Sequence, residues 1–196
     1  MVDGLLDLRT LQFPEIENPT GIEIHVARRN NVEDKKRIGV LSTIQVSNLS
    51  LAPYWHSTPP EDYEDMRQGW GDELLGDEST WTVWLATEKD TPLGMIGTRP
   101  EAEEPTKMLA SPRTMYVSIA STEPASRGRG IGTALTWECL KHARENGFET
   151  CYINWNSPNF LASRFWPRFG FTEVGYRLSK QIAPTILWAN GRPPTL

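Results

Sequence analysis

The clearest chemical potential lies in a ten-residue segment, Pro124 to Thr133, that is rich in glycine and arginine. Its glycines allow backbone N–H groups to approach a bound group closely; they are Gly128, Gly130 and Gly132. Arg127 and Arg129 alternate with them and add cationic donors. The residues that follow have the spacing of an amphipathic helix, whose unpaired first amides attract anions. The segment therefore predicts an anion site, most naturally for phosphate or pyrophosphate.

Three phosphate-binding motifs compete for this segment. A P-loop requires a Gly-Lys dipeptide, and the chain has none. A Rossmann fingerprint that starts at Gly128 needs glycine where Thr133 stands, and an acid about 20 residues later, near Ile153. The third motif is Gln or Arg, two residues, Gly, one residue, then Gly or Ala, and residues 127–132 match it in full. One alternative stays open, in which the glycines are only hinges before a helix, although each lowers helix propensity by about 1 kcal/mol.

Hydrophobic periodicity predicts the elements that must position this segment. A strand over 114–121 precedes it, and a helix over 131–146 follows it. The other predicted strands cover 21–29, 81–87, 93–98, 151–155 and 172–179, and the other predicted helices cover 32–49, 60–75 and 158–169. The order β-α-α-β-β-β-α-β-α-β indicates an α/β (α+β) fold, with a mixed, mostly antiparallel central sheet and helices on both of its faces. Residues 1–20 are expected to form an irregular arm.

Composition excludes several classes of function. The 196 residues include 20 Lys and Arg against 25 Asp and Glu, a net charge of −5 that disfavours a general nucleic-acid binder. Two cysteines without a CxxC spacing and three scattered histidines predict no metal site. Two cysteines without a disulfide pattern are typical of a reducing compartment, so the chain is expected in the cytoplasm. No apolar run approaches the roughly 18 residues that span a bilayer, so no membrane partner is expected.

The chain resembles the GNAT superfamily of acyl-CoA-dependent N-acyltransferases. Besides the loop at 127–132, the block Asn159 to Phe171 reads N-F-L-A-S-R-F-W-P-R-F-G-F, which is similar to the family's N-x-x-A-x-x-F-Y-x-x-x-G-F. The resemblance covers roughly 21–180, and its specific part is confined to 114–176. It implies a single GNAT-like acyltransferase domain over 21–182, preceded by the arm at 1–20 and followed by a C-terminal tail over 183–196.

The resemblance also implies a cofactor site for acetyl-CoA, used as a co-substrate. Main-chain groups near Ala120 and Thr122 would pair with the pantetheine arm, to which Asn159 would also hydrogen-bond. Trp166 stands where the family often has a tyrosine that protonates the departing thiolate, and an indole N–H has no usable acidity; packing is the other interpretation of Trp166. The amides that would bind the pyrophosphate belong to Arg127, Gly128, Arg129, Gly130, Ile131, Gly132 and Thr133.

The reaction that the resemblance implies is direct attack of a primary amine on the thioester, and the chain is therefore expected to be an N-acetyltransferase. The amine must first lose a proton, and the sequence offers two weak candidates for the base, Tyr116 and Glu123, each of which has an ordinary core or loop interpretation. The acceptor is expected to be a small-molecule or peptide amine, and many proteins of this architecture form homodimers. Two other functions stay open: a non-catalytic acyl-CoA-binding or sensing module, and a phosphate- or nucleotide-binding protein unrelated to CoA.

Overall fold

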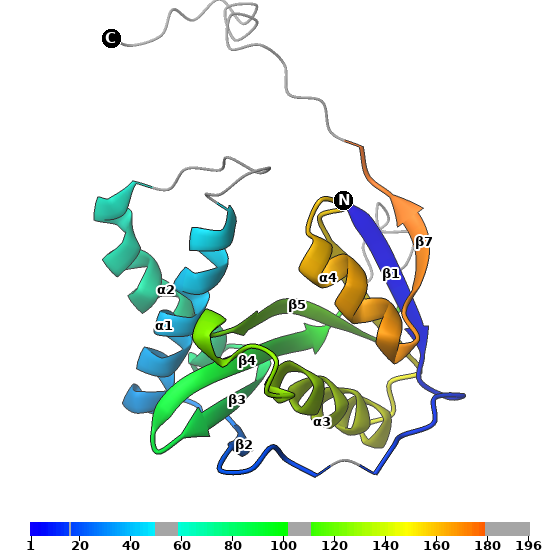
Figure 1. Ribbon diagram of the computed structural model, residues 1–196, viewed down its shortest axis with the longest axis horizontal. Helices are drawn as coiled ribbons and strands as arrows, with labels where there is room; N and C mark the ends of the chain where they lie inside the picture. The colour runs from blue at the N-terminus through cyan, green and yellow to red at the C-terminus, as the bar shows by residue number, and fades with distance from the viewer. Residues whose placement is uncertain (16, 50–58, 102–110, 179–196) are drawn as a thin grey trace, which may run out of the picture.

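The computed structural model describes residues 1–15, 17–49, 59–101 and 111–178. These residues form one seven-stranded sheet in the order β2-β3-β4-β5-β6-β1-β7, with four α-helices around it (Figure 1). Neighbouring strands are antiparallel except for the parallel pair β5–β6. The strands are β1 (Val2–Asp7), β2 (Glu23–Val26), β3 (Thr82–Glu88), β4 (Thr91–Pro100), β5 (Thr114–Thr122), β6 (Thr150–Trp155) and β7 (Thr172–Tyr176); the helices are α1 (Val32–Leu49), α2 (Tyr63–Leu75), α3 (Ile131–Glu145) and α4 (Phe160–Phe165). The predicted fold class is confirmed.

Each face of the sheet has its own apolar core, because successive side chains of a strand point to opposite faces. In β3, Val83 and Leu85 pack with α1 and α2, whereas Trp84 and Ala86 pack with α3 on the other face. The segment that follows β6 adds its aromatic residues to the α3 side. The sheet therefore has helices on both of its faces, as predicted. Within the described ranges, no helix combines the length and apolar character that crossing a bilayer requires.

The prediction of an irregular arm over 1–20 is wrong for residues 2–7. These residues form β1, which lies between β6 and β7 and pairs with both. Val2 and Leu6 are buried in the core on the α3 side, while Asp3 points to the other face. A short strand with one glycine and two aspartates has little intrinsic strand propensity, so pairing with distant partners decides its structure. The predicted tail over 183–196 lies outside the described residues.

Two glycines allow α1 and α2 to cross closely. A Cβ atom added at Gly39 would lie 2.5 Å from the carbonyl oxygen of Arg67, and one added at Gly71 would lie 2.8 Å from that of Lys35. In both cases the obstacle is backbone of the facing helix, which a side-chain rotation cannot move aside. Close packing of the two helices therefore depends on glycine at both positions.

Gly39→Ala is expected to destabilise the protein by about 1–3 kcal/mol, the usual cost of overpacking a well-packed contact. The matched control is Gly69→Ala in α2, because a Cβ at Gly69 meets nothing within 4 Å. That change should stabilise the protein by up to about 1 kcal/mol through helix propensity. Urea unfolding of the two variants measures both effects, and a free energy of unfolding that changes with the same sign in both would contradict this packing argument.

Candidate active site

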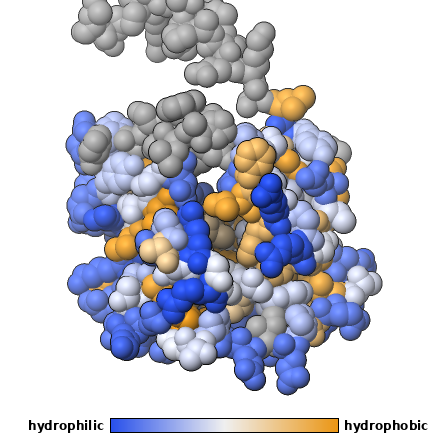
Figure 2. Space-filling model, viewed as in Figure 1, coloured by the Kyte–Doolittle hydropathy of each residue, from blue (hydrophilic) through white to orange (hydrophobic). Residues whose placement is uncertain are grey.

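The parallel strands β5 and β6 pair only over the first part of their length and then separate. The space between them is called the opening below. The two strands pair from Thr114–Thr150 to Val117–Ile153. Beyond this point β5 stays paired with β4 as far as Thr122, and β6 stays paired with β1 as far as Trp155. Residues 118–122 of β5 thus have one edge without a strand partner among the described residues. Figure 2 shows a recess over β5, between α1 and α4.

A β-bulge at Ser118 changes the direction of the side chains where the strands separate. The register with β4 shifts so that Gly97 faces Ile119 while Thr98 faces Val117. Val117 consequently packs in the core on the α3 side, whereas Ile119 packs with α1 and α2, although only one residue separates them. Bulges of this kind re-aim side chains and end regular pairing. Here the bulge marks the base of the opening.

The predicted phosphate loop leads from the end of β5 into α3. Gly128 and Gly130 have φ angles of +79° and +82°, which glycine adopts without the cost that a side chain brings. Gly130 is the N-cap of the 15-residue α3, and no side chain caps this end. A Cβ at Gly132 would lie 3.4 Å from the Phe165 ring and 3.6 Å from the Thr122 hydroxyl. The first amides of α3 therefore lie at the end of the opening, where they can receive an anion.

The two arginines of the loop differ in their partners. Arg129 pairs with Glu88 at the tip of the β3–β4 hairpin, with 2.6 Å between Nη2 and Oε1. The Glu88 carboxylate, as a hydrogen-bond acceptor, raises the pKa of Arg129, and the guanidinium lowers the pKa of Glu88. Arg127 is exposed and forms no ion pair within the part of the chain that the structure describes. Arg129 therefore links the loop to the hairpin through an ion pair. The positive charge of Arg127 is not neutralised by a carboxylate of the described residues.

The other predicted cofactor residues lie around the same opening, in two different settings. The Asn159 side chain caps α4 by accepting a hydrogen bond from the Ala162 N–H at 3.2 Å, which leaves its amide NH₂ for other partners. Trp166 is 5% exposed and packs edge-on against Phe165 and Phe171. This burial accords with the packing interpretation of Trp166. Ala120 and Thr122 lie on the unpaired stretch of β5.

Tyr116 and Glu123, the two candidate bases, lie at opposite ends of β5. Six strand residues lie between them and place them roughly 20 Å apart, so they cannot both act on one reacting atom. Glu123 directly precedes the loop, and its N–H donates to the Leu93 carbonyl. Tyr116 lies at the base of the opening, one residue before the strands separate. Tyr116 therefore has the better position for chemistry at the end of a long cofactor arm.

Tyr116 belongs to a polar cluster on the face of the sheet away from α3. Its ring stacks on that of Tyr152, with 5.1 Å between centroids, and its hydroxyl accepts a hydrogen bond from Asn154 Nδ2 at 2.8 Å. Tyr152 donates to Asp3 Oδ1 at 2.6 Å, and Arg177 pairs with the same carboxylate oxygen at 2.9 Å. Sequence reasoning missed this cluster except for Tyr116. The one available signal was the alternation of polar residues with buried ones along residues 151–155.

Tyr152 is a poor base in this cluster. Burial and the hydrogen bond to Asp3 raise the pKa of its phenol to about 12, so the hydroxyl stays protonated at neutral pH. Its oxygen also accepts from Asn154 and Arg177, which fills its hydrogen-bonding capacity. The hydroxyl hydrogen of Tyr116, by contrast, has no acceptor among the residues that the structure describes. Of the two tyrosines in the cluster, Tyr116 is therefore the one with a free donor.

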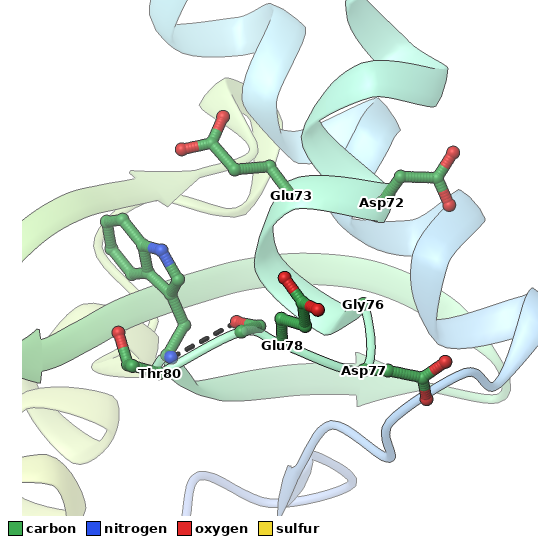
Figure 3. A pocket seen from close by; sticks show the side chains of 8 residues that line it. Asp72, Glu73, Gly76, Asp77, Glu78 and Thr80 are labelled. Atoms are coloured by element: carbon green, nitrogen blue, oxygen red, sulfur yellow. Dashed lines mark hydrogen bonds between the residues drawn. The ribbon is translucent and has the colours of Figure 1, made fainter.

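An acidic hollow of about 580 Å³ lies at the corner of α2 and β3, and its wall contains none of the predicted cofactor residues. Two of its carboxylates are already bound: Asp72 pairs with Lys35 at 2.8 Å, and Asp77 accepts from Asn30. Figure 3 shows Asp72 and Glu73 leaving α2 in opposite directions. The hollow is thus partly an ion-pair surface that links α1 to α2.

The chain is similar to a known protein family over more than half of its length. The family model described as "Acetyltransferase (GNAT) family" matches residues 44–171, which is more than half of the chain. The chain belongs to the GNAT acetyltransferase family. The predicted resemblance is confirmed, and so is the predicted enzyme class, acyltransferase. The match includes the loop and the whole Asn159–Phe171 block.

Relatives and solved structures of this family agree with the assignment. A mycothiol acetyltransferase of Rhodococcus erythropolis is 28% identical over 165 residues, which are 82% of this chain and 50% of that protein. The chain thus spans about half the length of the curated relatives it matches. An aminoglycoside N-acetyltransferase in complex with CoA shares the fold, with a TM-score of 0.60, 16% identity, and coverage of 85% and 99%. A protein of Clostridium acetobutylicum described as a "predicted acetyltransferase with acetyl-CoA" has a TM-score of 0.60, 16% identity, and coverage of 82% and 96%.

Proposed function

We propose that this chain transfers the acetyl group of acetyl-CoA to a primary amine of a small molecule by direct attack on the thioester. The observation that carries the proposal is the opening between β5 and β6, with the amides of the α3 loop at one end and Tyr116 at the other. Mycothiol and aminoglycoside acetyltransferases among the similar proteins support a small-molecule amine. Family membership favours this enzyme over the non-catalytic module. The two free, buried cysteines support a reducing, cytoplasmic setting.

The residues around the opening fit a CoA molecule. No atom lies within 4 Å of a Cβ built at Gly128, so the loop leaves room beside its amides. Trp155 ends β6 beside the opening, and its indole N–H is buried without a hydrogen-bond partner among the described residues. Such an orphaned donor costs about 1–3 kcal/mol, which an amide carbonyl of a bound arm would offset. Both features suit a phosphate-bearing cofactor with an extended amide-containing arm.

Each part of the chain has a defined role in the proposed reaction. Acetyl-CoA, when bound, supplies an activated acetyl thioester. The first amides of α3 and Arg127 bind phosphate, while the free edge of residues 118–122 offers main-chain groups to the arm, as a sheet edge does to an added strand. The Tyr116 hydroxyl, held by Asn154, is free to donate a hydrogen bond to the reacting groups. An amine acceptor, with an ordinary pKa near 10.4, must reach this point as the free base.

Thiol release from acetyl-CoA, measured across amino sugars, polyamines, amino acids and peptides, tests the proposed function. Acetylation of at least one amine, confirmed by the mass of the product, is the expected result. Tight CoA binding in calorimetry without turnover of any amine would instead favour the acyl-CoA-binding module. Binding of ATP in place of CoA would favour a phosphate- or nucleotide-binding protein unrelated to CoA.

Tyr116→Phe is expected to lower kcat by about 10- to 100-fold, because the variant loses one donated hydrogen bond to a group that gains charge. The KM for acetyl-CoA should change little, since the phosphate loop lies at the other end of β5. Glu123→Gln is the matched comparison on the same strand, and its kcat should stay within a few-fold of the parent value. Steady-state kinetics of the two variants decide between them, and a larger loss in Glu123→Gln would make Glu123 the better candidate.

A further inference from the structure

Arg99 of β4 is a half-buried arginine without a carboxylate partner. Its guanidinium carbon lies 5.6 Å from the centroid of the Trp81 ring and 5.5 Å from that of the Tyr116 ring. Arg37 is the other half-buried arginine in the described ranges, and it pairs with two carboxylates. For Arg99, no ion pair or hydrogen bond of the guanidinium occurs within the residues that the structure describes. Sequence periodicity ended the strand before Arg99, whereas the structure places this residue inside β4.

Arg99 lies beside the base of the opening, on the face of the sheet away from α3. It faces Tyr116 in the β4–β5 register, and Tyr116 faces Tyr152 in the β5–β6 register. Arg99 is therefore one strand spacing, about 4.8 Å, from the strand that borders the opening. The loop that would hold the cofactor phosphates belongs to the α3 side. An acceptor that approaches from the opposite face would meet the row of Arg99, Tyr116 and Tyr152.

The position of the Arg99 guanidinium over two aromatic rings leaves its N–H donors available to a ligand. The guanidinium carbon lies over the Trp81 and Tyr116 rings, and these cation–π contacts hold the group in place. Its N–H donors, which lie in the guanidinium plane, have the fork geometry that matches a carboxylate. A guanidinium can pair in a bidentate way with a carboxylate or a phosphate, but its single positive charge balances a carboxylate and not a phosphate dianion. A held guanidinium with unused donors is thus prepared for a carboxylate.

We propose that Arg99 is the anion-recognition residue of the acceptor site, and that the acceptor is an amine with a carboxylate a few bonds away, as in an amino acid or a short peptide. This inference rests on the proposed function. The Trp81 and Tyr116 rings hold the guanidinium, the carboxylate of the acceptor binds its edge, and the amine then points toward the opening. Discrimination between acceptors follows from the carboxylate, because an analogue without one leaves the guanidinium donors without an anion.

Matched pairs of amines test the proposal: alanine and alaninamide, lysine and cadaverine, glycylglycine and glycylglycinamide. The parent protein should have a kcat/KM at least about tenfold higher for the carboxylate member of a productive pair. Arg99→Gln should lower that kcat/KM by about 10- to 100-fold and leave that of the partner without a carboxylate within about twofold of the parent value. Arg99→Lys, which keeps the charge but not the fork, should lie between them. The dissociation constant for CoA, measured by calorimetry, should stay unchanged in both variants.

The possible outcomes separate this inference from the proposed function. Equal or better turnover of the amines without a carboxylate by the parent protein overturns the role of Arg99 and leaves the acetyltransferase intact. An equal loss for both members of a pair in Arg99→Gln shows that the stack is only structural. Absence of turnover with every amine rejects the proposed function itself, and this inference with it. If Arg99→Gln does not fold, as thermal unfolding would show, the comparison of the paired amines with the parent protein still decides.

Arg113→Gln, at an exposed arginine that pairs with Glu149, is the control for loss of one positive charge.

Discussion

Gly130→Glu is expected to weaken CoA binding by more than about 100-fold, equivalent to about 2.7 kcal/mol. Gly130 has a φ of +82° and directly precedes the first amides of α3. A glutamate there strains the backbone and brings a negative charge to the point where phosphate oxygens would accept hydrogen bonds. Calorimetric titration of CoA into the parent and the variant measures the loss.

Gly147→Glu is the matched control for this change. Gly147 follows the other end of α3, also has a φ of +82°, and has no atom within 4 Å of an added Cβ. It therefore shares the backbone strain and the added charge of Gly130→Glu, without the place in the loop. CoA affinity in Gly147→Glu should stay within about threefold of the parent value. Retained CoA binding by Gly130→Glu would support the hinge interpretation of the loop glycines.

Asp34→Asn is expected to destabilise the fold by about 3 kcal/mol or more, the scale for removing one partner of a buried ion pair. The Asp34 side chain is fully buried and accepts from Arg37 Nη1 at 2.8 Å and from the Arg28 N–H at 2.9 Å. It therefore ties the end of β2 to the first turn of α1. The asparagine keeps one acceptor but leaves the Arg37 guanidinium without its buried anion. Urea unfolding at pH 7 measures the difference in the free energy of unfolding.

Asp72→Asn is the matched control, because Asp72 also pairs with a cation of α1, Lys35, but is 70% exposed. An exposed pair contributes about 0–1 kcal/mol, so this variant should unfold almost like the parent. Equal destabilisation by the two aspartate variants would contradict the importance of burial.

The contribution of Asp34 should also depend on pH. Burial raises the pKa of Asp34, but the hydrogen bonds from Arg28 and Arg37 outweigh it, so the net pKa lies below the ordinary 3.8. A group with a depressed folded pKa contributes its stability above the unfolded pKa and loses it as the pH falls through the folded one. The stability difference between the parent and Asp34→Asn should therefore be constant near pH 7 and shrink below about pH 3.8. A difference that stays constant down to pH 2 would contradict this assignment.

Local patterns account for most of the fold. The helix from Val32 to Leu49 has the predicted bounds, and the strand–loop–helix unit at 114–146 forms as expected, because apolar spacing and turn residues are properties of contiguous segments. The exceptions are segments whose structure depends on distant partners. β1 becomes a strand through β6 and β7, and Arg99 joins β4 through its pairing with Tyr116.

The candidate site divides in the same way. The phosphate loop could be predicted because its donors are consecutive amides at one helix start, so spacing alone defines it. The cluster of Tyr116, Tyr152 and Asp3 could not, because its members come from three strands that are neighbours only in the folded sheet. The sequence by itself determined the family, the loop and the kind of fold. Only the tertiary structure decided which polar residues face the opening, because sheet order and the bulge at Ser118 set the direction of each side chain.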